Sequence, residues 1–189
     1  MAASKARTST KQKQDAFQTV TRPELLVDGN DDAFRALVHS SLAFASRLMA
    51  VRDGYAKAIG LAGPQYTILM SIRYLQQVGD VHVKTIAEHL SLSGTFVTTE
   101  VNRLVDKKLV VKKRDPQDAR RVRLTTSELG QERLRKLAPM QRQINDVHFG
   151  TLTRSEFDAL REIMPKLVSS TDEAVSLIRH LARSNGSDD

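Results

Sequence analysis

Apolar residues recur along most of the chain at intervals of three and four, which places them on one side of an α-helix. This spacing, with glycine, proline and capping residues as boundaries, predicts six helices at about 31–59, 64–79, 83–90, 93–107, 128–147 and 153–181. After Leu109 the period changes to two, and apolar residues alternate with Lys and Arg across a turn, as in a β-hairpin. The expected fold class is therefore mainly α with one small hairpin.

The third and fourth predicted helices are short and are separated only by Ser91-Leu92-Ser93, which is the pattern of a helix-turn-helix. Ser93 is a good N-cap for the fourth helix. One side of that helix carries Val97, Val101, Leu104 and Val105. At 100° per residue, the other side carries Thr95, Thr99, Asn102, Arg103 and Asp106. This outer side is rich in groups that bond to base edges and phosphates.

Phe96 projects outside the apolar stripe of the fourth helix, near Arg103. A large apolar side chain in this position is either covered by a neighbouring loop or placed against a thymine methyl group. We expect the covered arrangement.

The positive charge of the chain is concentrated on the predicted hairpin. The segment from Lys107 to Arg123 holds eight Lys or Arg against two Asp, a balance of +6 where the whole protein has +7. The turn residues Asp115, Pro116 and Asp118 suit a hairpin tip, which an ion pair from Asp118 to Arg120 would brace. A basic hairpin beside a polar-faced helix indicates a polyanionic partner, and the other arginines would suit a minor groove.

Composition excludes several other classes. The 189 residues are 40% apolar, enough for one domain with tails. No apolar run of about 18 residues and no signal peptide occur, so we expect a cytoplasmic protein without a membrane span. Cysteine is absent. The five histidines lie far apart and no catalytic or phosphate-loop motif is found, so we expect no enzyme activity and no cofactor.

Three motifs occur in an order typical of one protein family. They are Gly60-Leu61-x-x-x-Gln65, then Ile86-Ala87-x-x-Leu90, and the strongest, Asp115-Pro116-x-Asp118-x-Arg120 followed by Val122-x-Leu124-Thr125. With these motifs the chain resembles the MarR family of winged-helix transcription regulators from about residue 32 to 181. One departure is Lys108, which stands where the family usually has a glycine.

The resemblance implies a homodimer whose terminal helices interlock and whose winged-helix lobes bind a pseudo-palindromic operator on double-stranded DNA. It also implies a repressor released by a small aromatic or phenolic acid. The corresponding domain plan is a flexible basic arm at 1–30 and a MarR-like domain at 31–183, followed by a disordered tail at 184–189. The domain itself divides into a winged helix at about 64–125 and dimerisation helices at about 31–59 and 127–183. The arm is either a solvated terminus or a DNA-touching extension.

The predicted site residues form two sets. The DNA-binding set comprises Ser93, Thr95, Phe96, Thr98, Thr99, Asn102, Arg103, Lys112, Lys113, Arg120, Arg121 and Arg123. The second set is a predicted ligand site at the junction of the dimerisation helices and the DNA-binding lobe. Its cationic and aromatic side chains would suit an organic anion: His39, Arg47, Arg52, Tyr66 and Met70.

Two alternatives of the same fold remain open. A metal-responsive regulator would bring His148 and His180 together with acidic side chains, although no recognisable ligand spacing supports it, and we predict no metal. A winged helix used only for protein contacts would leave the clustered arginines without a role.

Overall fold

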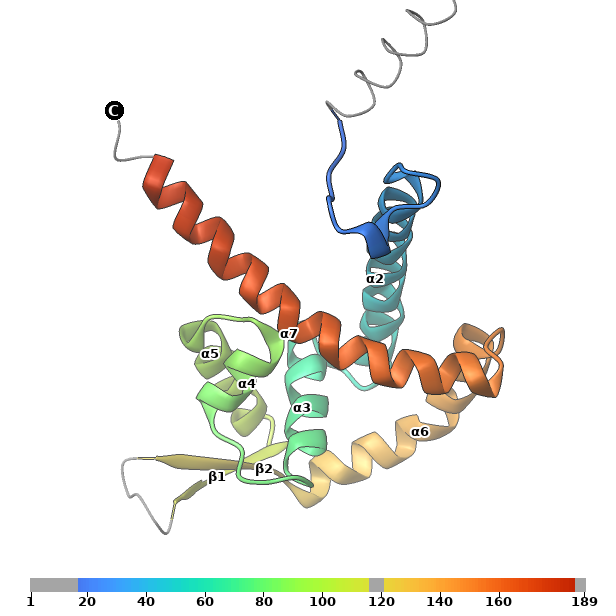
Figure 1. The fold of residues 1–189 in the computed structure, drawn as a ribbon. Helices are drawn as coiled ribbons and strands as arrows, with labels where there is room; N and C mark the ends of the chain where they lie inside the picture. Colours follow the sequence, from blue (N-terminus) through green and yellow to red (C-terminus); the bar gives the residue numbers. More distant parts are fainter. Residues whose placement is uncertain (1–16, 116–120, 186–189) are drawn as a thin grey trace, which may run out of the picture. The chain divides into compact units, whose positions relative to one another are not determined.

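The structure is a computed structural model that describes residues 17–115 and 121–185. It divides into two compact units, with the boundary between Leu137 and Ala138. The first unit contains η1 (Pro23–Leu25), α2 (Asp32–Ala58), α3 (Gly63–Leu75), α4 (Val83–Leu90), α5 (Gly94–Asp106), β1 (Val110–Arg114), β2 (Val122–Thr126) and the start of α6 (Glu128–Phe149). The second contains the rest of α6 and α7 (Arg154–Asn185). The mainly α fold with one hairpin is confirmed (Figure 1).

The core of the first unit lies where α3, α4 and α5 meet the base of the hairpin. Its fully buried side chains come from every one of these elements: Tyr66, Ile68, Leu69, Ile72, Val81, Ile86, Val97, Val101, Leu104, Leu109 and Leu124. Burying aliphatic side chains of this size stabilises a fold by roughly 1.5–3 kcal/mol each. The apolar stripes predicted for these helices therefore hold the helix-turn-helix and the hairpin as one body.

The hairpin is antiparallel, with Val110 opposite Thr126 and Lys112 opposite Leu124. It extends outward from α3 and α5 (Figure 1). Its buried positions are Val110, Leu124 and Thr126, all near the base, whereas Val111 and Val122 are exposed. The backbone N–H of Leu124 also donates to the Val81 carbonyl at 2.7 Å, which ties β2 to the segment before α4.

The turn between α5 and β1 keeps a left-handed residue although the family glycine is absent. Lys108 has φ = 59°, its N–H donates to the Val105 carbonyl, and the Leu109 N–H donates to the Leu104 carbonyl. These two bonds form a Schellman motif, which normally has glycine at the left-handed position. The cap is therefore retained, and Lys108 bears the strain.

We expect Lys108→Gly to stabilise the protein by about 1 kcal/mol, because glycine adopts positive φ without the clash that Cβ causes. The measurement is the free energy of unfolding from urea denaturation. Lys107→Gly is the control, since Lys107 has φ = −73° and glycine there should destabilise instead. Equal effects of the two substitutions would contradict the assignment of strain to position 108.

The start of α6 is fixed to the same turn by Ser127. Its N–H donates to the Leu109 carbonyl at 2.9 Å, and its hydroxyl donates to the Lys108 carbonyl at 2.6 Å. The Gly130 N–H in turn donates to the Ser127 hydroxyl oxygen, as at a capped helix N-terminus. A Cβ on Gly130 would lie 2.3 Å from the Leu109 carbonyl oxygen, so only glycine fits this approach.

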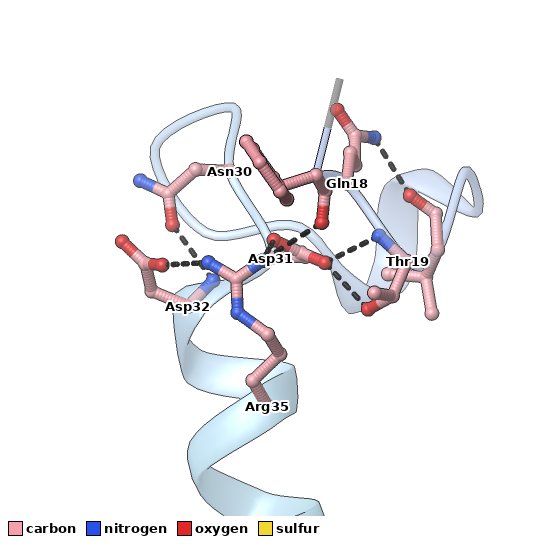
Figure 2. A network of polar contacts seen from close by, with 8 residues as sticks. Gln18, Thr19, Asn30, Asp31, Asp32 and Arg35 are labelled. Carbon is pink, nitrogen blue, oxygen red and sulfur yellow. Dashed lines mark hydrogen bonds and ion pairs between the residues drawn. The ribbon is translucent and has the colours of Figure 1, made fainter. Parts of the chain in front are cut away.

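The segment before α2 folds onto the start of that helix (Figure 2). Both the N–H and the hydroxyl of Thr19 donate to Asp31 Oδ2 at 2.6 Å, and Arg35 pairs with the other oxygen at 2.7 Å. The Thr19 bonds, with a smaller contribution from Arg35, hold the pKa of Asp31 below its ordinary value. The part of the predicted arm from residue 17 onward is thus folded, and residues 1–16 lie outside the described ranges.

Asp31 occupies the N-cap position of α2, but its carboxylate makes no capping bond. The Asn30 side chain accepts from the Asp32 N–H at 3.0 Å instead, because the carboxylate of Asp31 is turned toward Thr19 and Arg35. The sequence predicts the helix start correctly here, although a different side chain caps it.

In the second unit, the capping box predicted at the start of α7 is confirmed. The Thr153 N–H donates to Glu156 at 2.7 Å and the Glu156 N–H donates back to Thr153 Oγ1. The hydroxyl and the N–H of Thr153 hold the pKa of Glu156 below its ordinary value. No residue of α7 is buried in the single chain.

The helices and the C-terminus extend further than a break at each proline would allow. Pro139 was expected to kink or break α6 and Pro165 to disturb the last helix; neither helix is broken, because α6 and α7 each continue through their proline. Both prolines are exposed, so water can bond the carbonyl that each leaves without a helical partner. Ser184 and Asn185, assigned to the loose tail, are helical.

Candidate nucleic-acid interface

The outer side of α5 is exposed as predicted. Val97, Val101 and Leu104 are buried, whereas the exposed residues are Thr95, Thr98, Thr99, Asn102, Arg103 and Asp106. Ser93 caps the helix, its hydroxyl oxygen accepting from the Phe96 N–H at 3.2 Å. The hydroxyls of Thr98 and Thr99 donate to carbonyls one turn earlier, at 2.8 and 3.1 Å, which leaves their acceptor sites toward solvent.

Asn102 and Lys112 are bonded to each other, Nζ donating to the amide oxygen. Both were predicted DNA contacts, one on the helix and the other on the hairpin. The bond links the middle of β1 to α5, so the polar side of the helix and the first lysine of the strand are adjacent on the surface.

Arg103 is held by an acidic residue that sequence reasoning missed. Glu100 lies within the apolar side of α5 with its side chain 5% exposed, and its Oε1 pairs with Arg103 at 2.5 Å. Gln65 of α3 donates to its Oε2 at 3.1 Å. The signal was present in the sequence, because Glu100 follows Val97 by three residues and precedes Leu104 by four, so it shares their side of the helix.

Arg123, which was predicted to contact DNA, is held in ion pairs at the side of the hairpin. Its guanidinium pairs with Asp80 at 2.6 Å and with Asp115 at 3.5 Å, and its side chain is only 28% exposed. The antiparallel register places Arg123 opposite Lys113, and its guanidinium is held by Asp80 from the loop before α4 and by Asp115 from the end of β1. The period-two pattern predicts only which face of the strand carries Arg123. It cannot predict the ion pair with Asp80, because Asp80 lies in the loop before α4.

Asp115, which was predicted to have a structural role at the wing tip, is buried directly after β1. Its side chain is 7% exposed, lies 3.5 Å from both Arg123 and His82 Nε2, and its N–H donates to the Arg121 carbonyl. The other nitrogen of the His82 ring lies 2.9 Å from the Val122 carbonyl oxygen. His82 thus joins the two strands at the point where the described hairpin ends.

The remaining basic residues of the hairpin are on its surface. Lys113 and Arg121 are exposed, and so is Arg114, which was not among the predicted DNA contacts. The expected ion pair from Asp118 to Arg120, and Pro116, lie outside the described residues.

Phe96 is 39% exposed, so the expectation that a loop covers it is wrong. It is an apolar side chain among the hydroxyls of the exposed α5 surface.

The predicted ligand set is brought together only in part. The Arg52 guanidinium lies over the Tyr66 ring, 5.1 Å from its centroid, and Tyr55 meets Tyr66 edge to face at 6.0 Å. Burial raises the pKa of Tyr55. Met70 is half-buried on α3. His39 and Arg47 are exposed on α2, and Arg47 donates to the Ala43 carbonyl of its own helix.

Across the described ranges, no three His, Asp or Glu side chains gather in an arrangement that would hold a metal ion. The same ranges contain no helix with the length and apolar character needed to cross a membrane.

A helix-turn-helix whose second helix presents a polar surface, followed by a basic two-stranded hairpin, defines a winged-helix protein. Residues 59–121 match the model of the MarR family. The matched residues include the helix-turn-helix, β1 and, as far as Arg120, the motifs on which the resemblance to this family rests. A comparison with curated protein sequences found no match.

Several solved structures share the fold. The MarR/EmrR family transcriptional regulator from Acinetobacter sp. ADP1 has 20% identity and a TM-score of 0.62, covering 75% of this chain and 99% of its own. A mutant of E. coli MarR complexed with operator DNA has 19% identity, 72% and 94% coverage, and a TM-score of 0.57. The S. aureus MepR–DNA complex has 19% identity, 79% and 99% coverage, and a TM-score of 0.55.

Proposed function

We propose that this protein is a homodimeric, sequence-specific DNA-binding regulator of transcription, acting as a repressor that a small aromatic acid releases. The observation that carries the proposal is the exposed polar side of α5 joined to the basic hairpin through the bond between Asn102 and Lys112. A helix in the major groove with a basic extension beside it is an established way of binding duplex DNA. Two of the structures that share the fold are complexes with DNA.

The division of labour follows from exposure. Thr95, Thr99, Asn102 and Arg103 would contact base edges, with Phe96 against a thymine methyl group. Lys112, Lys113, Arg114 and Arg121, all exposed, would contact phosphates or the minor groove. Arg120 lies outside the described residues and joins this set because the family resemblance places the wing arginine there. Arg123 is left out of this set because two carboxylates hold it.

Dimerisation is supported by the apolar residues that the single chain leaves uncovered. On α7 they are exposed by between 36% and 65%, and on α2 Leu37, Leu42 and Met49 are exposed by about half or more. Apolar stripes of this length are normally buried against a partner. A second copy, as the family resemblance implies, would also supply two recognition helices for a pseudo-palindrome.

The effector would bind beside Arg52 and Tyr66, where a cation lies on an aromatic ring at the end of α2. It would release DNA by preferring a spacing of the two DNA-binding lobes that does not fit the operator. Calorimetry with a panel of aromatic carboxylates, on the wild type and on Arg52→Ala, tests this part separately from DNA binding.

DNA binding is tested by a salt titration with a duplex selected by the wild-type protein from a random pool. We expect log K to fall with log salt with a slope of about −4 or steeper, because each neutralised phosphate contributes about −0.9. Lys113→Ala should make the slope shallower by about 2, one phosphate from each subunit. Lys136→Ala on α6, which removes the same charge from an exposed lysine paired with Glu132, is the control. A slope near zero for the wild type would overturn the proposal.

A further inference from the structure

Glu100 is an acidic residue buried among apolar side chains of the core. It shares the inner side of α5 with Val97, Val101 and Leu104, all fully buried, and is itself 4% exposed. A buried carboxylate is costly unless hydrogen bonds and an opposite charge compensate it. Its place in the core therefore needs a reason beyond packing.

Each carboxylate oxygen has its own partner. Oε2 accepts from Gln65 Nε2 at 3.1 Å, and Oε1 pairs with Arg103 at 2.5 Å. Gln65 is also fixed, because its side-chain oxygen accepts from the Ala62 N–H at the start of α3. Gln65 of α3 therefore fixes the Glu100 carboxylate within the core, and the carboxylate in turn holds the Arg103 guanidinium.

Arg103 spans the boundary between core and surface. One terminal nitrogen is at Glu100, while 58% of the side chain remains exposed on the side of α5 that carries Thr99 and Asn102. An arginine held at one nitrogen has fewer rotamers to lose when the rest of its planar fork binds a partner. The planar fork matches the two acceptors of guanine in the major groove, and this pairing is specific rather than a general phosphate contact.

We propose that Glu100 is a positioning residue that orients Arg103 to read one guanine in each half-site. The proposal rests on the DNA-binding function proposed above. It assigns Arg103 to base readout and Glu100, with Gln65 behind it, to the preorganisation of that contact. A phosphate contact would not need a buried acid behind the arginine, because the acid reduces its charge.

The test compares base preferences of the full-length protein by competition binding on duplexes that differ at one position of the selected operator. Arg103→Ala identifies the base pair that Arg103 contacts. Glu100→Gln, which keeps a partner for Gln65, should lower the preference at that same pair by about 3- to 10-fold and leave the salt slope unchanged. In the Arg103→Ala background, Glu100→Gln should change the preference no further. Glu88→Gln on α4, an exposed acid-to-amide change, is the control.

Thermal unfolding monitors the fold of each variant. Should Glu100→Gln melt below the assay temperature, the double variant Gln65→Leu/Glu100→Leu replaces both buried partners by apolar groups and should show the same loss of preference. The proposal is overturned if a folded variant keeps its base preference at that pair within twofold of the wild-type value. It is also overturned if the variant loses base preference equally at all operator positions. Failure of the wild type to select any duplex would instead overturn the DNA-binding function.

Discussion

Alanine at position 130 is expected to destabilise the protein by about 3 kcal/mol, the upper part of the range for overpacked sites. The added Cβ would lie 2.3 Å from the Leu109 carbonyl oxygen and 3.2 Å from the carbonyl carbon. Backbone cannot rotate away as a side chain can, so α6 must shift. That shift would break the bonds from Ser127 to Lys108 and Leu109, which fix the helix to the end of α5.

The matched control is Gly54→Ala. Gly54 is an exposed glycine inside α2, and a Cβ there has no atom within 4 Å. Because glycine is a poor helix residue, this substitution should stabilise by about 0.5–1 kcal/mol. Urea denaturation of the two variants should therefore give changes of opposite sign. A destabilisation by Gly130→Ala of under about 1 kcal/mol would show that α6 approaches Leu109 less closely than the structure has it.

The second large effect concerns the uncovered apolar side of α7. The double variant Leu167→Glu/Ile178→Glu is expected to be monomeric at micromolar concentration, since it would bury charge in the proposed dimer interface. Its operator affinity should fall by at least about 100-fold, because a lone half-site loses the effective concentration that the second lobe provides. Sedimentation velocity and competition binding on the selected operator measure the two effects.

Ser169→Glu/Ser176→Glu is the control for this experiment, because at 100° per residue these positions lie on the opposite side of the helix from Leu167 and Ile178. It adds the same charge and should remain dimeric. If Leu167→Glu/Ile178→Glu sediments as a dimer, this side of α7 is not part of the dimer interface. If the wild type is monomeric at the same concentration, the proposal of a dimer is wrong.

Sequence patterns that span only a few residues predicted most of the helices and the hairpin. Helical spacing with Ser93 as a cap predicted α5, and the change of period after Leu109 predicted the hairpin. The reciprocal pair Thr153 and Glu156 predicted the start of α7. These succeed because their causes act within a few residues: a cap, a turn, and one side of a helix facing the core.

The prolines show where a local rule was applied too strongly. Proline removes one N–H donor and disturbs the preceding turn, which predicts a break. Pro139 is exposed, and so is Arg135, whose carbonyl loses its helical partner, so water can reach that carbonyl while Leu134 and Leu137 pack inward. The cost of a helix proline depends on its surroundings, which a single sequence does not contain.

The order of residues by itself determined that this chain forms short helices, a basic hairpin and a polar-sided α5, because each depends on neighbours in sequence. Only the tertiary structure decided which charged side chains are paired with one another and which remain on the surface. Arg123 is held by Asp80 from 43 positions away, while Glu100 is drawn into the core and keeps Arg103 in place. Charge pairing depends on distance in space, and that distance is set only when the helices pack.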